Sequence, residues 1–367
     1  MPADLVFSNH GLRHSGGIER YLLTLVDGLH ARGMRPTVVA HHFDRKLPEF
    51  GWVDPVEIPT RGLGGALRDL WFDARLRRLK RERGWYPLVA LSQTSASDVA
   101  ISGGTHPGFL AAMGRRARWK DRLAIGLERK HFGGAALVVA HSKLMAEQVR
   151  TFYGVRPEAI DVLYPPVDTQ RFHAVDEARR LALRATLGLP HDRAVFLLAS
   201  TGHARKGLDL AVEALGHSDA PVLLVVAGRP TGLSAPNLRE LGFRTDMEDV
   251  YRAVDCTVMA SRFEPFGLVG VESVLCGTPL IGEAGMGCME VIREPAAIPF
   301  RIDAAGSLQA AIDVALARWR EGTLRVADPR AMLAYDPSVD AHLNALLAHV
   351  TALRAKRDGS TWTSAAK

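Results

Sequence analysis

The chain has 367 residues, which favours two domains, and 47% of them are hydrophobic, as in a globular protein with a core of ordinary size. Its 46 lysines and arginines outnumber 40 aspartates and glutamates, a mildly basic balance that suits an anionic small molecule, an anionic membrane surface or nucleic acid without choosing among them. The sequence lacks a signal-peptide core, a run near the roughly 18 apolar residues of a membrane-spanning helix and any CxxC pair, and so predicts a cytoplasmic protein.

In the first part of the chain, short apolar runs alternate with helical patterns. A helix is expected over 17–33, between strands at 4–9 and 36–42. Further elements are expected as strands at 87–92, 99–103 and 136–142 and a helix at 143–154. A strand–helix–strand series of this kind is typical of a parallel sheet.

The pattern restarts after two adjacent prolines, Pro165 and Pro166, which suggest a linker. The second series holds expected strands at 194–200, 221–228, 238–243, 256–261 and 279–284. Two such series predict an α/β protein with two doubly wound, Rossmann-like domains facing across a cleft. We place the domains at 1–165 and 166–345, and a C-terminal helix or tail at 346–367 that could cross back to the first domain.

Two glutamates flank the expected start of a helix directly after the strand at 256–261. Glu264 and Glu272 have seven residues between them, and the helix is expected to begin near Gly267 or Leu268. The loop therefore lies at the carboxyl end of a strand, where open α/β sheets bind ligands. The outward N–H groups there, those of Phe266, Gly267 and Leu268, would be donors for an anion or for hydroxyls.

A carboxylate aimed at a phosphate would be repelled, so we expect Glu264 and Glu272 to accept hydrogen bonds from hydroxyls instead. A ligand with hydroxyls at both ends and phosphates between them is a nucleotide sugar. The alternative is that Glu264 is a solvated loop residue and Glu272 a partly exposed helix residue.

A second loop adds cations at the same inferred sheet edge. Arg205 and Lys206 follow the strand at 194–200 and Gly202, and Gly207 opens the next helix. A diphosphate needs fixed cations because negative charge grows on it as it leaves. The two loops together predict a diphosphate site, although Arg205 and Lys206 could also form a solvated basic turn.

Two features of the first domain could reach a ligand. Gly16 and Gly17 lie in a strand-to-helix turn that would let the backbone approach a phosphate, although an ordinary tight turn is the alternative. His106 follows a strand and two glycines, but a lone histidine can equally be structural or merely exposed. The chain contains no GxGxxG, Walker A, HExxH or DxD motif, so we expect no cofactor and no metal for the chemistry.

Residues 113–132 are strongly basic and carry apolar partners. A basic amphipathic helix of this kind can lie on an anionic membrane or border an acceptor site. The residues proposed for this surface are Arg115, Arg116, Arg118, Trp119 and Lys120. Residues 68–86 form a second basic stretch. Two solvated surface helices are the alternative, and nucleic acid is disfavoured because no recognition motif accompanies the charge.

Three of these motifs together resemble those of retaining glycosyltransferases of family 4. The segment EPFGLVGVE resembles their E-x7-E motif, HARKG their Arg/Lys phosphate loop, and SGGIER their N-terminal glycine loop. The similarity runs from about residue 5 to 345. The resemblance implies the GT-B fold, two Rossmann-like domains with the active site between them.

The resemblance also implies roles for single residues. Glu272 would bind the ribose hydroxyls, and Glu264 would lie beside the transferred sugar. Arg205 and Lys206 would stabilise the leaving diphosphate. The other implied contacts are the backbone of Phe266, Gly267 and Leu268 with the sugar and phosphates, Gly16, Gly17 and Gly202 with the donor, and His106 near the acceptor and the anomeric carbon.

One position departs from the family pattern. Many members carry an arginine about five residues before the lysine, where this chain has Thr201. This variant resembles the glucosyltransferases that modify heptose I of the lipopolysaccharide core.

The resemblance implies metal-independent transfer, with retention, from a nucleotide-diphosphate sugar to a glycan or glycolipid of lipopolysaccharide or another cell-surface polysaccharide. UDP-sugar is the favoured donor. A front-side displacement fits, because no side chain is an obvious covalent nucleophile. The alternatives are a non-catalytic nucleotide- or glycan-binding protein and a nucleotide-sugar epimerase of the same fold.

Overall fold

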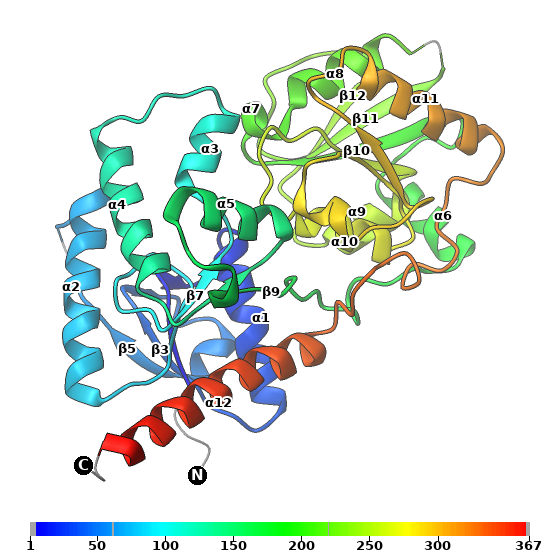
Figure 1. Ribbon diagram of the computed structural model, residues 1–367. Coiled ribbons are helices and arrows are strands. Elements are labelled where there is room, and N and C mark those ends of the chain that lie inside the picture. The colour runs from blue at the N-terminus through cyan, green and yellow to red at the C-terminus, as the bar shows by residue number, and fades with distance from the viewer. Residues whose placement is uncertain (1–4, 61, 219, 365–367) are drawn as a thin grey trace. The chain divides into compact units, whose positions relative to one another are not determined.

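The computed structural model describes residues 5–60, 62–218 and 220–364, and the chain divides into two compact units (Figure 1). Unit 1 takes the residues up to 166 and those from 337 onward, and unit 2 takes residues 167–336. The chain returns to unit 1 earlier than the expected boundary at residue 346. The reason is that helix α12 (Val339–Ser364) packs along helix α1 (Gly17–Ala31) from its first turn.

Unit 1 is built on a parallel sheet whose described strands follow the order β5-β3-β1-β6-β7-β8-β9. The strands are β1 (Val6–Ser8), β3 (Thr37–Ala40), β5 (Asp54–Glu57), β6 (Leu88–Ala90), β7 (Val99–Ser102), β8 (Leu137–Ala140) and β9 (Ile160–Val162). Beyond β1 and β3 the chain pairs again as the short strands β2 (Gly11–Leu12) and β4 (His42–Phe43). The strand order reverses between β1 and β6, which is the topological switch point of a doubly wound sheet.

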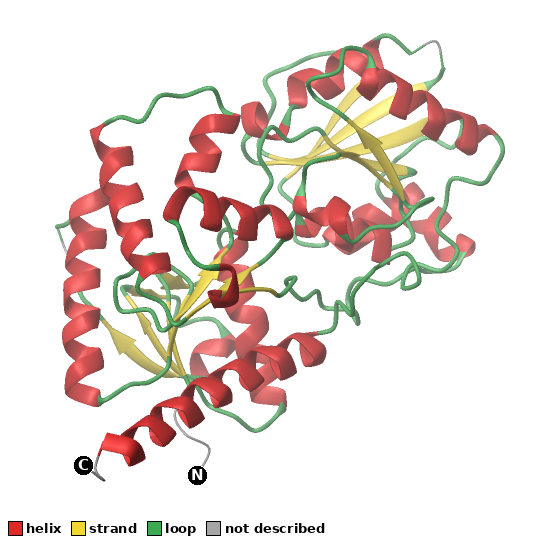
Figure 2. Cartoon of the chain, in the orientation of Figure 1, coloured by secondary structure: helices red, strands yellow, loops and turns green. Residues whose placement is uncertain are grey.

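Both faces of this sheet are covered by helices (Figure 2). Successive strand residues point to opposite faces, so Phe7 joins the core beneath α1 and α12, whereas Val6 joins the core beneath α2 (Gly65–Arg83). A further cluster on the α2 side lies beneath α4 (Trp119–Gly133) and α5 (Lys143–Tyr153). Burial on both faces explains why the strands are continuous apolar runs rather than alternating ones.

Unit 2 repeats this architecture, with described strands in the order β12-β11-β10-β13-β14-β15. The strands are β10 (Ala194–Ser200), β11 (Val222–Gly228), β12 (Leu238–Gly242), β13 (Cys256–Met259), β14 (Leu280–Glu283) and β15 (Ala297–Phe300). Helices α8 (Leu208–Gly216) and α11 (Ser307–Arg320) share one core cluster with the sheet, and α6 (Glu177–Thr186), α9 (Met247–Ala253) and α10 (Leu268–Leu275) cover the other face (Figure 1). The switch point of this sheet lies between β10 and β13.

The predicted basic helix over 113–132 is wrong at its start. Helix α3 (His106–Ala112) ends just before Gly114, which adopts a positive φ of 61°, and α4 begins only at Trp119. The Arg118 N–H donates to Asp121 Oδ2 at 2.7 Å, and this bond closes the first turn of α4. Arg115 and Arg116 therefore lie in a loop rather than on a helix face.

Helix α12 completes the core of unit 1. His342 donates from Nδ1 to the Tyr164 carbonyl (2.9 Å), and its Nε2 accepts the Tyr21 hydroxyl (2.7 Å). Burial lowers the pKa of His342 to about 4, which keeps the ring neutral, so that one nitrogen can donate and the other can accept a hydrogen bond. Within the described ranges, α12 included, no helix is both long and apolar enough to cross a membrane.

The crossing of α12 over α1 depends on Gly28. A Cβ atom there would lie 2.5 Å from Val339 Cγ1 and 2.8 Å from Leu343 Cδ1. We predict that Gly28→Val lowers the free energy of unfolding by about 1–3 kcal/mol through overpacking, as measured by urea denaturation.

Gly126→Val on α4 is the matched control, because a Cβ atom at Gly126 would meet nothing within 4 Å. It should change the stability by less than about 0.5 kcal/mol. Equal stability of the two variants would show that α12 does not require the close approach at Gly28.

Candidate active site

The neighbouring strands β10 and β13 bring two distant loops together. They pair in parallel, with Phe196 opposite Cys256, so the segments after them emerge side by side at the carboxyl edge of the sheet. Helix α7 (His203–Lys206) follows β10, and the loop to α10 follows β13. This shared edge is the one expected from the sequence, and the contacts between the two segments confirm it.

Three charged side chains meet there and form the triad of Lys206, Glu264 and Arg205. Lys206 Nζ lies 2.5 Å and Arg205 Nη1 lies 3.1 Å from Glu264 Oε2. The Ser261 hydroxyl donates to the same oxygen at 3.4 Å. Within the described residues Glu264 Oε1 makes no hydrogen bond, so it remains open to a hydroxyl of a ligand.

The cations also set the charge of the carboxylate. Burial by itself would raise the pKa of Glu264, but Lys206 and Arg205 outweigh it and hold that pKa below its ordinary value. Both Glu264 and Lys206 are largely buried, with side chains 13% exposed. The two positive charges are therefore partly compensated by a carboxylate, a pairing that the sequence did not reveal.

A further ion pair fixes the loop that carries Glu264. Arg262 binds Asp209 through two bonds of 2.6 and 3.0 Å and donates from Nη1 to the Ala204 carbonyl (2.7 Å). The Arg262 N–H also donates to the Arg205 carbonyl at 2.8 Å. Sequence reasoning missed Arg262, although it stands two residues before Glu264. Its contacts hold the glutamate loop against α7.

His203, which the sequence analysis also missed, is fixed at both ring nitrogens. It lies between the Ser200 hydroxyl at 2.8 Å from Nδ1 and the Pro230 carbonyl at 3.0 Å from Nε2. Nε2 must donate to the carbonyl, because a carbonyl oxygen can only accept. The ring ties the first turn of α7 to the ends of β10 and β11.

Glycines in this region serve two different purposes. Gly207 has a φ of 67°, and a Cβ atom would lie 2.0 Å from the Ala260 carbonyl oxygen, so close backbone contact requires glycine there. Gly267 caps α10 with a φ of 95°. Gly202, in contrast, has a φ of −145°, and a Cβ atom would meet nothing within 4 Å. Neither backbone nor packing explains Gly202, which leaves open space beside α7.

The predicted helix start is confirmed, since α10 runs from Leu268 to Leu275. The first N–H groups of such a helix have no acceptor within the helix. Phe266 precedes the helix, and its carbonyl accepts from the Cys288 N–H at 2.7 Å. Gly267 and Leu268 thus lie at the helix terminus beside Glu264, as the sequence predicted.

Glu272 lies inside α10 and is buried, with 3% of its surface exposed. The Tyr251 hydroxyl donates to Glu272 Oε2 at 3.2 Å. The alternative of a partly exposed helix residue is therefore excluded. A buried carboxylate with a fixed orientation is suited to accept hydrogen bonds from hydroxyls.

In unit 1, Gly16 and Gly17 begin α1. Gly16 is the N-cap with a φ of −77°, where a Cβ atom would lie 3.2 Å from Glu19 Oε2, and at Gly17 it would meet nothing within 4 Å. A left-handed backbone is required at neither position. As at Gly202, the absence of side chains leaves room beside the start of α1.

His106 is the first residue of α3 and is held by α4. Its Nε2 lies 2.7 Å from Asp121 Oδ1, and its backbone N–H donates to the carboxylate of Glu128. The Arg118 N–H and then His106 lower the pKa of Asp121, so this carboxylate is ionised at neutral pH. The side chain of His106 remains 28% exposed and has a fixed direction.

The proposed membrane residues lie around the start of α4. Arg115, Arg116 and Arg118 are exposed, and Trp119 is 66% exposed. Lys120 Nζ lies 5.3 Å from the centre of the Trp119 ring. These five residues form an exposed cationic and aromatic surface on unit 1.

The three cysteines, Cys256, Cys276 and Cys288, are buried free thiols. Among the described residues, no cluster of three or more His, Cys, Asp or Glu side chains could hold a metal ion.

Comparison with known proteins identifies the family. The model of Glycosyltransferase Family 4 matches residues 15–171, and that of Glycosyl transferases group 1 matches residues 180–318. A probable transglycosylase of Burkholderia thailandensis is 44% identical over 343 residues, which are 93% of this chain and 94% of that protein.

Solved structures show the fold. WaaG, a glycosyltransferase involved in lipopolysaccharide biosynthesis, aligns with a TM-score of 0.74 and 18% identity over 87% of this chain and 92% of its own. HepE of Anabaena, in complex with UDP and glucose, aligns with a TM-score of 0.74 and 19% identity over 95% and 99%. Each unit contains a large parallel sheet with flanking helices, which agrees with this likeness. The chain therefore has the GT-B fold and belongs to family 4 of the glycosyltransferases, as the three sequence motifs indicated.

Proposed function

We propose that the protein transfers a sugar, with retention of anomeric configuration, from a UDP-sugar to a glycan or glycolipid acceptor. The observation that carries this proposal is the triad of Lys206, Glu264 and Arg205 at the switch point of unit 2. Its cations are fixed before a ligand arrives, so little reorganisation is needed when a diphosphate forms. The proposed reaction uses no metal ion, because the two cations supply the charge that a metal would otherwise provide.

Each member of the triad has a proposed part in the reaction. As the bond between the anomeric carbon and the phosphate oxygen breaks, Lys206 and Arg205 take up the charge of the leaving diphosphate. The acceptor hydroxyl attacks the same face of the sugar, and its proton passes to the departing phosphate oxygen. Glu264 then interacts less strongly with the two cations, and its Oε1 accepts a hydrogen bond from a sugar hydroxyl.

The other donor contacts are proposed from the same geometry. Glu272, oriented by the Tyr251 hydroxyl, would accept hydrogen bonds from the ribose hydroxyls. The helix terminus at Phe266, Gly267 and Leu268 would bind the sugar and the phosphates. The glycines without a structural explanation, Gly16, Gly17 and Gly202, would let phosphates approach the backbone.

His106 is proposed to lie near the acceptor and the anomeric carbon. Asp121 holds its ring through Nε2 at 2.7 Å. The ring therefore has one orientation in which to meet an acceptor hydroxyl. Its contribution would be positioning, because the leaving phosphate takes the proton.

The donor and the pathway are proposed from the neighbours. HepE was solved with UDP and glucose, which supports UDP as the first nucleotide to test. The likeness to WaaG supports an acceptor in lipopolysaccharide or another cell-surface polysaccharide. Such an acceptor would be met at the inner face of the cytoplasmic membrane.

We also propose that unit 1 contacts this membrane. Helices α2 and α4 pack together (Figure 1), and each exposes apolar residues near its start. Leu67 is 67% and Trp71 46% exposed on α2, and Trp119 is 66% exposed on α4. Exposed aromatic residues among arginines are typical of a peripheral membrane surface.

The first test is the turnover of Lys206→Ala. Its kcat should fall about 100- to 1,000-fold, with a smaller change in donor affinity, because the lysine acts chiefly on the leaving group. The measurement is the release of UDP from UDP-glucose with a lipopolysaccharide core oligosaccharide as acceptor.

Arg301→Ala is the control, since it removes an exposed ion pair with Asp303 and should leave kcat unchanged. A Lys206→Ala enzyme with full kcat would contradict the leaving-group role. Wild-type binding of UDP without any transfer would instead favour a non-catalytic nucleotide-binding protein.

The membrane proposal is tested with anionic vesicles. Replacing Arg115, Arg116 and Arg118 by glutamine should weaken vesicle binding at low salt by about 1 kcal/mol per charge, and the difference should shrink as salt is added. The measurement is cosedimentation with phosphatidylserine vesicles at several salt concentrations.

A triple variant at the other end of α2, Arg78, Arg81 and Arg83 to glutamine, changes the net charge by the same amount. It should bind nearly as the wild type does. Equal losses in the two triple variants would mean that net charge, and not this surface, governs binding.

A further inference from the structure

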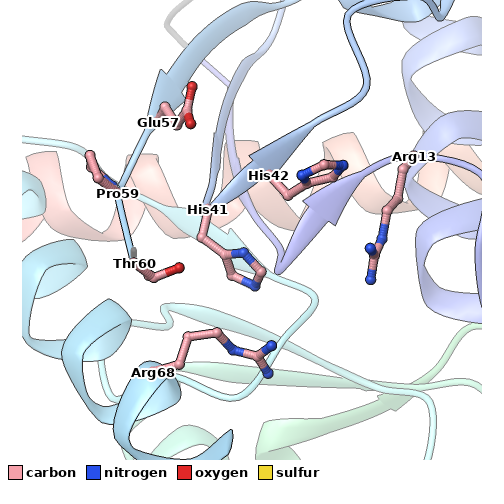
Figure 3. A pocket seen from close by; sticks show the side chains of 7 residues that line it. All are labelled: Arg13, His41, His42, Glu57, Pro59, Thr60 and Arg68. Atoms are coloured by element: carbon pink, nitrogen blue, oxygen red, sulfur yellow. The ribbon is translucent and has the colours of Figure 1, made fainter. Parts of the chain in front are cut away.

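Unit 1 contains a polar pocket at the carboxyl ends of β1, β3 and β5 (Figure 3). None of its lining residues has a role in the reaction proposed above. The pocket has a volume of about 290 Å³ and is lined by Arg13, His41, His42, Glu57, Pro59, Thr60 and Arg68. At ~30 Å³ per water molecule this is the space of about ten waters, more than a bare phosphate or carboxylate needs.

Positive charge dominates the wall of this pocket. Arg13 makes no hydrogen bond or ion pair within the described residues. Arg68 binds Asp69 Oδ1 through Nε and Nη2, both at 3.0 Å, which leaves Nη1 directed elsewhere. Glu57 is the one carboxylate among the lining residues, and Arg45 engages it at 3.3 Å.

Two histidines behind the arginines have unsatisfied nitrogens. Among the described residues, Nε2 of His41, which lines the pocket, is buried and has no hydrogen-bond partner. Nε2 of His10, outside the pocket lining, is also buried without a hydrogen bond to a described residue and lies 3.9 Å from Asp69 Oδ1. Their ring centres lie 5.6 Å apart, and the edge of Phe72 packs against both rings. A buried polar nitrogen without a partner is costly, so an unexplained one on a pocket wall points to a ligand.

The protonation of these histidines bears on the sign of the charge that the ligand carries. Burial, reinforced by His10 and Arg68, lowers the pKa of His41 to about 4. Burial likewise lowers the pKa of His10, with Asp69 acting against it. Both rings are neutral at pH 7, and the positive charge of the pocket comes from Arg13 and Arg68. Two guanidinium groups repel a metal cation and attract an oxyanion.

The remaining wall suits a sugar ring. Thr60 offers a hydroxyl and His42 an imidazole, and Pro59 adds an apolar face. In Figure 3 the guanidinium groups of Arg13 and Arg68 and the imidazole of His41 point into one space from three different segments. We propose that this pocket binds a sugar that carries an oxyanion, a phosphate or a carboxylate. On the proposed function, on which this assignment rests, that sugar is part of the acceptor.

The test measures binding without any nucleotide. Glucose 6-phosphate, glucuronate, inorganic phosphate and glucose are titrated into the wild type at constant ionic strength, and the ring signals of the histidines are followed by NMR. Glucose 6-phosphate or glucuronate should bind and raise the pKa of His41, because a nearby anion favours the imidazolium. Glucose should bind at least about tenfold more weakly. Whichever anionic sugar binds more tightly identifies the source of the oxyanion.

Arg68→Gln and Arg13→Gln should each weaken that binding about tenfold or more, whereas Arg81→Gln on the same helix should not. Equal affinity in the wild type and Arg68→Gln would overturn the proposal. The proposal would also be overturned if glucose bound as tightly as glucose 6-phosphate. It would be overturned as well if inorganic phosphate bound but neither anionic sugar did.

Two variants separate this proposal from the proposed function. Lys206→Ala should bind the anionic sugar as the wild type does, whatever happens to transfer. Sugar binding without transfer from any UDP-sugar would contradict only the proposed function. Transfer with the same acceptor KM in Arg68→Gln and the wild type would contradict only the assignment of the pocket to the acceptor.

Discussion

The pairing of β10 with β13 is the interaction on which the candidate active site depends. It places Arg205 and Glu264 beside each other, although 58 residues separate them in the chain. The carboxylate then holds the two cations in place before any ligand binds, and they in turn keep it ionised although it is buried. A leaving diphosphate would therefore meet charges that are already oriented, and Glu264 would be released toward the sugar.

Unit 1 differs from unit 2 in how its core is closed and in how its charged side chains are paired. Its core is closed by α12, which reaches α1 only because Gly28 carries no side chain, and His342 ties that helix to the end of the linker at Tyr164. At the carboxyl edge of its sheet, Arg68 is paired with Asp69 but Arg13 has no partner among the described residues, whereas Arg205 and Lys206 of unit 2 are both paired with Glu264. The two sheets thus share a doubly wound topology but present different arrangements of charge at their carboxyl edges.

Much of this architecture was predictable from the sequence. The amphipathic helices α1 and α5 and the central strands, which are buried on both faces, gave clear signals, and the loop motifs identified the family. The edge strands β5, β9 and β15 were missed. Pro55 and Pro299 break the apolar runs of β5 and β15, and β9 is only three residues long with an aspartate at its centre. The pairing of Glu264 with the cations was missed because charge alone suggested a role with hydroxyls. The pocket of unit 1 has no motif, since its residues come from segments that only the fold brings together.

Nucleotide binding by Glu272 is the most direct test of the proposed donor site. Calorimetric titration of the wild type with UDP, GDP and ADP should show binding of one nucleotide, and we predict UDP. Glu272→Gln, which keeps an acceptor for Tyr251, should weaken that binding by about 1–3 kcal/mol, whereas Glu213→Gln on the exposed face of α8 should not. Equal affinity of Glu272→Gln and the wild type, or no binding of any of the three nucleotides, would contradict the account.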